Sequence, residues 1–362
     1  MTRVLFVYNQ VSEKERKGLF GECTLEKDVE IIRSALQESN NDILSLNLES
    51  PEQLEKYVLA NQPVDLAFVI AEGFKAEPHT LYNGHGAALI RRYLAKFNIP
   101  STLSSVESME ICRNKDLTYA RLIDWDIPIP KFLVFETHFL KNINFLENQV
   151  TDLGYPVIIK PAGGGNSIGI TSKSVVSNFQ HLKIQVKNLY KQLGHTNLII
   201  EKFLDGPEYT IGLLGNRLKY ILPIIEFPRK LGVRDTATKK NEHKIRDQFN
   251  IIANSDSRFS EISEIGVKTF EAVRANDLLR IDLKEDEYGK IYVIDVNGTP
   301  SLTANGSLNF MASKLGIEHK RLIQMVLYES MKRYGFKPTP FFDELIKEYK
   351  TRLDQYESSE VA

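Results

Sequence analysis

A β-hairpin that carries two acidic side chains is predicted at residues 278–297. The letters DEYG form a turn between two β-rich runs. If the turn is centred between its tyrosine and glycine, Asp282 lies opposite Asp295 and Arg280 lies opposite Asn297. Because side chains two residues apart share one face of a strand, these four side chains converge. The other face is the expected core face, with Ile281, Leu283, Ile294 and Val296.

This convergence has the chemistry of a site for a divalent cation. Two facing carboxylates repel each other unless a cation lies between them. With the amide oxygen of Asn297 they form a hard oxygen site, which suits Mg²⁺ (or Mn²⁺) shared with phosphate oxygens. Arg280 beside them can neutralise a carboxylate or phosphoryl charge. The alternative is a surface hairpin on which Arg280 simply pairs with the acids.

A second candidate segment is a lysine followed by a glycine-rich loop. Lys160 ends the predicted strand VIIK, directly before PAGGGNSIG. The glycines allow backbone N–H groups to approach an anion, and Asn166 and Ser167 add side-chain donors. The loop is not a Walker A motif, and no GxGxxG follows the first strand. Taken alone, a flexible hairpin tip explains this loop equally well.

The segment LIIEKFLDGPEYT carries two acids, Glu201 and Glu208, around a turn. An acid at a strand–turn junction can accept hydrogen bonds from an adenine amino group or from ribose hydroxyls. A solvated turn is the competing interpretation. Lys115 lies within the predicted helix SMEICRNKDLTYARLI, where a single lysine is usually solvated.

Two kinds of secondary-structure pattern must position these residues. Up to about residue 104, strands alternate with helices, which predicts a small parallel sheet with helices on both faces. From residue 105 the pattern is α+β: a helix over 105–125, a short strand GITSK after the glycine loop, and a single strand YILPIIEF. A mobile loop is expected at 228–249, a helix at about 261–275, two final helices, and a frayed end from about Tyr356.

Composition limits the classes of function. The chain has 362 residues, 42% of them hydrophobic and 26% charged, with a net charge of −1. There is no overall basic character for binding nucleic acid or an anionic membrane, and no apolar run of membrane-spanning length. Two cysteines are too few for a disulfide framework, which favours a reducing cytoplasm.

Taken together and in this order, the motifs resemble the ATP-grasp superfamily, most closely its D-alanine–D-alanine ligase branch. The resemblance is strongest over about residues 100–330. It implies an N-terminal Rossmann-like domain at 1–104, a central nucleotide lid at 105–204, a C-terminal antiparallel-sheet domain at 205–350 and a tail at 351–362. It also implies ATP and Mg²⁺ as cofactors, small amino-acid-like substrates and a homodimer.

Carried over to this chain, the resemblance implies roles for individual residues. Arg280 stabilises charge at the reacting carboxyl centre, and Ser167 lies in the loop that closes over the phosphates. The metal ligands are Asp282, Asp295 and Asn297, with Asp295 where the family usually has Glu. The nucleotide-binding residues are Lys115, Lys160, Glu201, Lys202, Phe203, Leu204 and Glu208.

The departures from the family pattern fall where substrates bind. Glu22 is the candidate for holding the first substrate's amino group, and Ser301 and Ser307 are candidates for a substrate carboxylate. A lysine of the 228–249 loop, Lys239 or Lys240, reaches the γ-phosphate. We therefore predict an ATP-dependent ligase that forms an amide bond through an acyl phosphate, in a specialised pathway. A divergent D-alanine–D-alanine ligase and a non-catalytic nucleotide-binding regulator are the alternatives.

Overall fold

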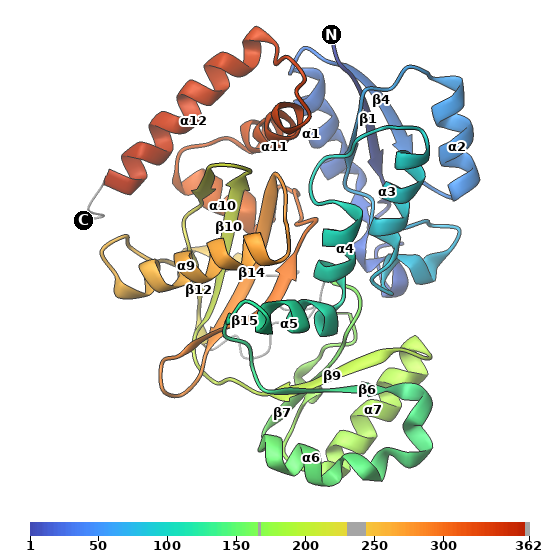
Figure 1. Cartoon of the computed structure of the whole chain (residues 1–362), viewed down its shortest axis with the longest axis vertical. Helices are drawn as coiled ribbons and strands as arrows, with labels where there is room; N and C mark the ends of the chain where they lie inside the picture. Colours follow the sequence, from blue (N-terminus) through green and yellow to red (C-terminus); the bar gives the residue numbers. More distant parts are fainter. Residues whose placement is uncertain (166–167, 230–243, 359–362) are drawn as a thin grey trace.

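The computed structural model describes residues 1–165, 168–229 and 244–358. Figure 1 shows three parts: a blue N-terminal domain, a green lid domain below it, and an orange C-terminal sheet beside both. The candidate site residues Ser167, Lys239 and Lys240 lie outside the described residues. Within the described residues, no helix combines the length and apolar character needed to cross a membrane.

The N-terminal domain is built on a parallel sheet of strand order β4-β1-β5, as predicted. Alternate residues of β1 face opposite sides: Val4 and Phe6 pack with α1 and the distant α11 (His319–Arg333), whereas Leu5 and Val7 pack with α2 and α3. The elements are β1 (Arg3–Tyr8), β2 (Gln10–Val11), β3 (Thr24–Leu25), α1 (Glu26–Gln37), β4 (Asp42–Asn47), α2 (Pro51–Ala60), β5 (Leu66–Val69) and α3 (Gly86–Lys96).

The predicted helix over 105–125 is two helices, α4 (Val106–Arg113) and α5 (Lys115–Ile123), because the chain is extended at Asn114. Asn114 forms an isolated antiparallel bridge with Gly163, at the start of the glycine-rich loop. Both helices pack on the C-terminal sheet through β15 (Ile291–Asn297). The break places Lys115 at the first position of α5, where it is buried rather than solvated.

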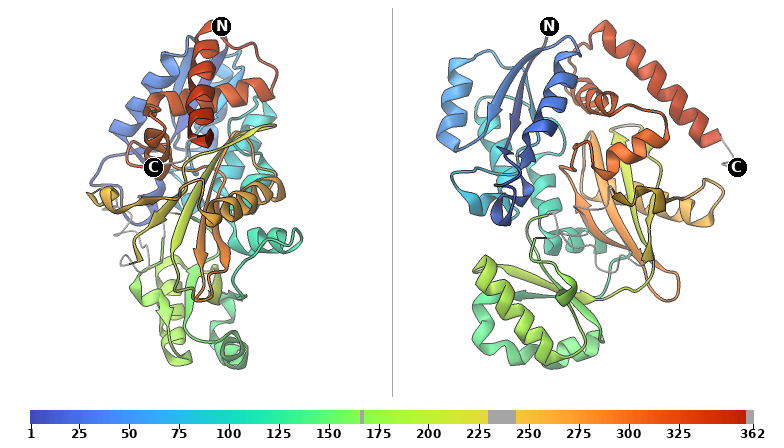
Figure 2. Two further views of the ribbon diagram at one scale, coloured as in Figure 1. Left: turned by 90° about the vertical axis from the view of Figure 1, so that its left-hand side faces the viewer. Right: turned by 180° about the vertical axis from the view of Figure 1, so that it is seen from behind.

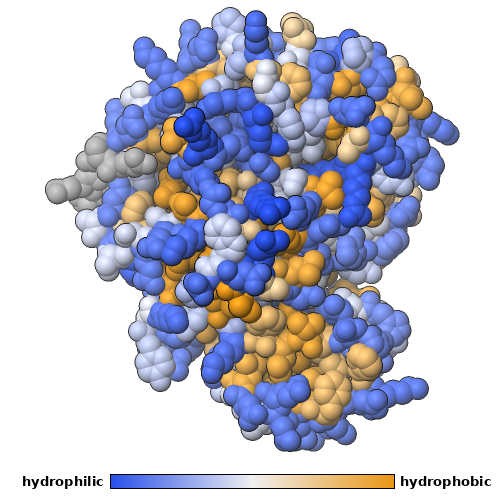
Figure 3. All heavy atoms as spheres, viewed as in Figure 1, coloured by the Kyte–Doolittle hydropathy of each residue, from blue (hydrophilic) through white to orange (hydrophobic). Residues whose placement is uncertain are grey.

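The lid domain is a four-stranded antiparallel sheet of order β6-β9-β7-β8, covered by α6 and α7. Its elements are β6 (Phe132–Glu136), α6 (Leu146–Leu153), β7 (Val157–Pro161), β8 (Val175–Val176), α7 (Phe179–Leu193) and β9 (Asn197–Lys202). The predicted strand GITSK is wrong: a hydroxyl-capped 3₁₀ turn occupies Ser172–Ser174, and the strand follows it. On the face seen in Figure 3, apolar residues gather over this lower domain.

The C-terminal sheet is antiparallel, in the order β13-β12-β10-β14-β15, with β11 paired to β10. The predicted strand YILPIIEF is divided into β11 (Lys219–Ile221) and β12 (Ile225–Phe227) by the segment around Pro223. The remaining elements are β10 (Glu208–Gly215), β13 (Asn250–Ile251), α9 (Ser257–Ala272), β14 (Leu278–Glu285) and β15 (Ile291–Asn297).

Three helices, not two, end the described chain: α10 (Ser307–Lys314), α11 (His319–Arg333) and α12 (Pro340–Ser358). The predicted frayed end differs, because α12 continues through Ser358 and Leu353 is buried in the core beside α11. Figure 2 shows α11 lying between the N-terminal domain and α12. The boundaries at 104, 204 and 350 stay predictions.

The predicted register of the β14–β15 hairpin is confirmed where it bears on the site. Asp282 is paired with Asp295, and Arg280 with Asn297. A β-bulge follows Asp282, so Leu283 pairs with Val293 instead of Ile294. The extra residue of a bulge re-aims its neighbours. Val293 takes the core position, and Ile294, which was expected in the core, lines a cavity instead.

Candidate active site

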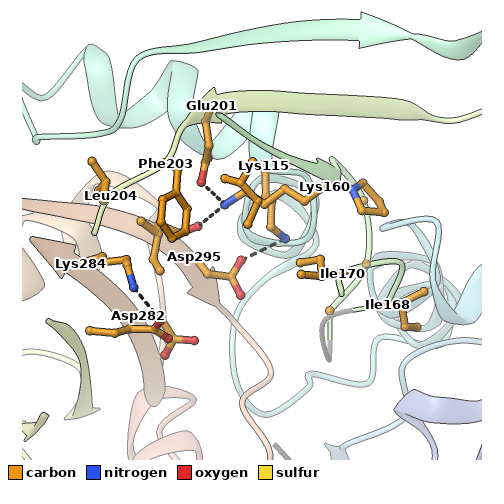
Figure 4. Close-up of a pocket in the computed structure, with 17 residues that line it drawn as sticks. Lys115, Lys160, Ile168, Ile170, Glu201, Phe203, Leu204, Asp282, Lys284 and Asp295 are labelled. Atoms are coloured by element: carbon orange, nitrogen blue, oxygen red, sulfur yellow. Dashed lines mark hydrogen bonds and ion pairs between the residues drawn. The ribbon is translucent and has the colours of Figure 1, made fainter. Parts of the chain in front are cut away.

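A cavity lies between the lid sheet and the C-terminal sheet (Figure 4). It encloses about 830 Å³ of empty space, including its open mouth. Most of the predicted nucleotide and metal residues line it, although they come from four separate segments. These are Lys115, Lys160, Glu201, Phe203, Leu204, Glu208, Asp282 and Asp295, together with Gly163, Gly164 and Gly165.

One part of the cavity wall is apolar. Phe203 and Leu204 follow β9, and four isoleucines complete the wall: Ile158, Ile168, Ile170 and Ile294. Among the described residues, no backbone hydrogen bond uses the Leu204 N–H. A flat aromatic base needs apolar walls and a few convergent polar groups, and this segment supplies both.

Lys160 and Glu201 form a buried ion pair, with 2.7 Å between Nζ and Oε1. The pair arises because β7 and β9 are adjacent, with Ile158 opposite Glu201. Tyr119 on α5 donates its hydroxyl to Glu201 Oε2 at 2.7 Å, and Lys160 Nζ donates to the Ile294 carbonyl at 3.2 Å. Burial and the nearby Glu201 carboxylate raise the pKa of Tyr119 well above its ordinary value. The contacts of Lys160 Nζ with Glu201 and with the Ile294 carbonyl fix the orientation of this ammonium group.

Lys115 faces the metal-site hairpin, with its Nζ 3.1 Å from Asp295 Oδ1. Its position depends on the glycine-rich loop, because the Lys115 N–H donates to the Ala162 carbonyl at 2.9 Å. In return, the Gly164 N–H donates to the Arg113 carbonyl at 3.2 Å. The start of α5 and the strand bearing Lys160 are therefore held side by side, and the two lysines point into one cavity (Figure 4).

Asp282 is buried at the floor of the site. It accepts hydrogen bonds from the Thr210 hydroxyl at 2.8 Å and from Arg280 Nε at 3.1 Å. Arg280 Nη2 reaches its second oxygen at 3.2 Å, so the guanidinium–carboxylate pair is bidentate. Arg280 therefore forms the ion pair that the surface-hairpin alternative expected. Its partner, the Asp282 carboxylate, is however buried rather than solvated.

The donor set fits a magnesium ion that is shared with a nucleotide. The described residues contain no group of three or more His, Cys, Asp and Glu side chains able to hold a metal alone. They do contain two carboxylates paired across adjacent strands, with Asn297 Nδ2 at 3.5 Å from Asp295 Oδ2. Mg²⁺ is commonly held by one or two carboxylates plus substrate phosphates, not by an all-protein cage. Lys115 pairs with Asp295 and Arg280 pairs with Asp282, so each acid has a positively charged partner.

Two predicted adenine and ribose residues occupy different environments. Glu208 begins β10 and lies 3.6 Å from Lys284 Nζ, because these two residues are partners across β10 and β14. Lys202 turns its side chain away from the cavity and donates to the carbonyls of Gly154 and Tyr155. Only its backbone can therefore contribute to the nucleotide site.

The substrate candidates are more scattered. Glu22 lies behind the glycine-rich loop, with Oε1 3.6 Å from Arg113 Nη2. Arg113 Nη1 also lies 3.4 Å from Glu72 Oε2. Ser301 is exposed and bonded to Thr303, whereas Ser307 begins α10.

Several residues of the site were missed from the sequence. Tyr119 lies one helical turn after Lys115, and Lys284 lies two residues after Asp282 on the same strand face; both spacings were readable. The place of Thr210 beside Asp282, and the pairing of Lys284 with Glu208, require the β10–β14 register, which is not visible locally. Glu72 and Arg113 gave no motif signal.

The fold and this cavity define an ATP-grasp protein, in which a nucleotide binds between two antiparallel sheets. Residues 122–328, more than half of the chain, match the family described as "D-ala D-ala ligase C-terminus". The chain belongs to this family. The membership confirms the resemblance and the predicted class of enzyme, an ATP- and magnesium-dependent carboxylate–amine ligase.

Individual relatives are distant but match along most of their length. A D-alanine–D-alanine ligase of Clostridium beijerinckii is 24% identical over 82% of this chain and 94% of its own. An uncharacterized protein, y4sG of Sinorhizobium fredii, is also 24% identical, over 74% of this chain and 75% of its own.

Solved structures confirm the fold. The D-alanine–D-alanine ligase of Bacillus anthracis complexed with ATP has a TM-score of 0.69 at 18% identity, covering 92% of this chain and 98% of its own. The VanG D-Ala:D-Ser ligase of Enterococcus faecalis has a TM-score of 0.64 at 17% identity, covering 91% of this chain and 99% of its own.

Proposed function

We propose that this chain joins the carboxylate of one amino acid to the amine of another, with ATP converting the carboxylate into an acyl phosphate. The observation that carries the proposal is the single cavity that combines an apolar wall with two lysines and two paired aspartates. The apolar wall suits an adenine base, and the charged part suits a triphosphate.

Different residues of the cavity bind different parts of the nucleotide in this proposal. Glu201 and the backbone from Lys202 to Leu204 face the base, and Glu208 faces the ribose. Lys115 and Lys160 contact the phosphates, and Asp282, Asp295 and Asn297 hold Mg²⁺. When bound, the cation neutralises phosphate charge that otherwise repels the attacking carboxylate.

The chain's own groups then position the reaction. The carboxylate oxygen of the first substrate attacks the γ-phosphorus, the bond to the β–γ bridging oxygen breaks, and ADP leaves. The deprotonated amine of the second substrate attacks the acyl carbon and expels inorganic phosphate. Arg280 stabilises the oxyanion through Nη1, since its Nε and Nη2 are used on Asp282. Ser167 is proposed to close over the phosphates.

Two candidate sets of substrates can be named for the reaction. The names of the relatives favour D-alanine as one candidate, in cell-wall synthesis. The departures at Glu22, Ser301 and Ser307 favour other amino acids in a specialised pathway, with Ser307 at the start of α10 receiving the second carboxylate. A cytoplasmic homodimer that binds neither nucleic acid nor membrane remains our prediction.

The direct test is ADP release with Mg²⁺ across pairs of L- and D-amino acids, with the dipeptide product identified by mass. Release with D-alanine alone supports the cell-wall alternative, and release with other pairs supports the specialised ligase. Tight ATP binding with no turnover on any pair would refute the ligase and leave a nucleotide-binding regulator.

A further inference from the structure

One charged side chain that lines the nucleotide cavity, Lys284 on β14, has no role in the mechanism proposed above. Lys284 lies two residues after Asp282, so both side chains face the cavity from the same side of the strand. The side chain of Lys284 is 14% exposed, and Figure 4 shows it near Phe203 and Leu204. This lysine therefore lies at the end of the cavity where the base and the ribose are proposed to bind.

The neighbours of Lys284 across the sheet are fixed by strand pairing. On one side, β10 places Glu208 opposite Lys284, with 3.6 Å between Lys284 Nζ and Glu208 Oε2. On the other side, β15 places Tyr292, whose hydroxyl donates to Asp286 in the hairpin turn at 2.9 Å. The acid that faces Lys284 is therefore Glu208, which also lines the cavity.

The Lys284 ammonium has donors left over for a ligand. Its distance to Glu208 is longer than that of a hydrogen bond, for which the two heavy atoms are about 2.7–3.2 Å apart. Its other neighbour is the Phe203 ring, whose centroid lies 5.8 Å from Nζ. Among the described residues, Lys284 Nζ donates no hydrogen bond.

A nucleotide that fills the cavity covers this ammonium group and displaces the water that hydrates it. A charged donor that loses water without gaining an acceptor costs free energy. The face of the Phe203 ring attracts a cation, but it does not replace a hydrogen-bond acceptor. The ligand must therefore carry an acceptor atom beside Glu208.

A hydroxyl group satisfies both members of the Lys284–Glu208 pair, because it donates one hydrogen bond and also accepts. Since the two charged atoms are 3.6 Å apart, one oxygen atom can lie at about 2.8 Å from each of them. A methylene group in the same position would satisfy neither. The pair therefore matches an alcohol, and ribose presents such groups at its 2′ and 3′ positions.

We propose that Lys284 is a nucleotide-binding residue that, together with Glu208, makes the site selective for a ribonucleotide. One ribose hydroxyl donates its hydrogen to the Glu208 carboxylate and accepts a hydrogen bond from Lys284 Nζ. This inference rests on the proposed function, which places the ribose against Glu208. It adds discrimination between ATP and its deoxy analogues, a property of binding that can be measured without turnover.

The test measures the affinity of the full chain for ATP, 2′-deoxy-ATP and 3′-deoxy-ATP in the presence of Mg²⁺, by isothermal titration calorimetry. The wild type should bind ATP about tenfold more tightly, or more, than one of the two analogues, because hydrogen bonds to charged groups are lost. Lys284→Met keeps an aliphatic stem and removes the donor. It should weaken ATP binding about tenfold and the binding of that analogue by about threefold at most.

The ratio of the two affinities isolates the hydroxyl, because the loss of one positive charge weakens all three triphosphates alike. Lys284→Leu also lacks the donor and should give the same ratio, so the test does not depend on one folded variant. Lys284→Arg should keep part of the preference, since a guanidinium also donates. Glu208→Gln should reduce the preference for the same hydroxyl, because a neutral amide accepts more weakly than a carboxylate.

Lys219→Met is the matched control. The Lys219 side chain is 11% exposed and pairs with Glu271 at 2.5 Å, so it is also a largely buried lysine with an acidic partner. It lies on β11 of the same sheet, which contributes no described residue to the cavity wall. This variant should leave all three affinities unchanged.

Equal weakening of the three nucleotides by Lys284→Met would overturn the inference, because the lysine would then act only through its charge or its packing. A wild type that binds both deoxy analogues as tightly as ATP would also overturn it, while leaving the proposed function intact. A wild-type chain that binds no nucleotide in the presence of Mg²⁺ would overturn the proposed function as well.

Discussion

The nucleotide cavity and the group formed by Glu22, Glu72 and Arg113, which we call the Arg113 cluster, are adjacent, but their charged side chains are arranged differently. In the nucleotide cavity each acid faces its own cation: Lys160 with Glu201, Lys115 with Asp295, and Arg280 with Asp282. In the Arg113 cluster the guanidinium lies between two acids, with Nη2 3.6 Å from Glu22 Oε1 and Nη1 3.4 Å from Glu72 Oε2. A ligand that brings both negative phosphates and a metal cation can replace the partners in the ion pairs of the nucleotide cavity, because it supplies charges of both signs.

The two regions also differ in how the chain brings their residues together. The acids of the metal site lie on one hairpin, where strand pairing alone makes them neighbours. Glu22, Glu72 and Arg113 lie in a 3₁₀ turn, at a strand end and on a helix, and only the packing of three elements joins them.

The largest expected effect is on the paired aspartates. Asp295→Asn or Asp282→Asn removes one of the two charges that we propose hold Mg²⁺, and we expect kcat for ADP release to fall by about a hundredfold to a thousandfold. The measurement is steady-state turnover at saturating ATP, repeated over a range of Mg²⁺ concentrations. Glu287→Gln in the exposed turn of the same hairpin is the control and should remain fully active. Variants as fast as the parent would remove the metal site from the mechanism.

The next largest effect is expected on stability, at the buried pair in the lid domain. Lys160→Met leaves the Glu201 carboxylate buried without its cation, which should lower the free energy of unfolding by about 3 kcal/mol. Urea denaturation without nucleotide measures this, with the exposed Lys173→Met as control. The double variant Lys160→Met/Glu201→Gln should recover most of the loss, because the uncompensated charge is gone. No recovery would mean that Lys160 acts through packing.

The contrast between local strand pairing and packing of distant elements also explains which site residues could be predicted from the sequence. Residues joined by local periodicity were found: Arg280, Asp282, Asp295 and Asn297 were placed on one face from the hairpin register alone. Ile294 was assigned to the wrong face, because a bulge depends on backbone geometry that the residue pattern does not record.

Residues joined only by packing were not found. Lys115 was expected to be solvated when considered alone, since nothing local signals the break at Asn114 or the bridge to Gly163. Glu72 and Arg113 are ordinary charged residues until three elements bring them together. Roles for Glu201 and Glu208 came from the family resemblance, and neighbouring strands supply the partners, Lys160 and Lys284, that sequence reasoning did not assign.

A third effect concerns how stability depends on pH through Glu72 in the Arg113 cluster. The pKa of Glu72 in the folded chain, about 7, lies above its ordinary value of 4.5. The folded state therefore binds the proton more tightly, and the wild type should lose stability as the pH rises from 4.5 to 7, by up to about 3 kcal/mol. Glu72→Gln removes this loss, so its advantage over the wild type should be greatest above pH 7. Thermal unfolding at pH 5 and pH 8 measures the difference, and an equal offset at both values contradicts the assignment.

The smallest effect is expected at the glycine where the two regions meet. Gly165→Ala places a methyl group 2.8 Å from Glu22 Oε1 and 3.0 Å from Arg113 Nη1, so the loop or the cluster must move. Both of those atoms belong to the Arg113 cluster, not to the lysines that we propose contact phosphate. We therefore expect the KM of the first substrate to rise by about tenfold, because a displacement of even 1 Å is costly in a site that orients its substrate. The KM for ATP should change less. Gly21→Ala is the matched control, since a Cβ atom there meets nothing within 4 Å although it neighbours Glu22. If Gly165→Ala raised the KM for ATP and left the first substrate unaffected, the loop would belong to the nucleotide cavity alone, and the two regions would function independently.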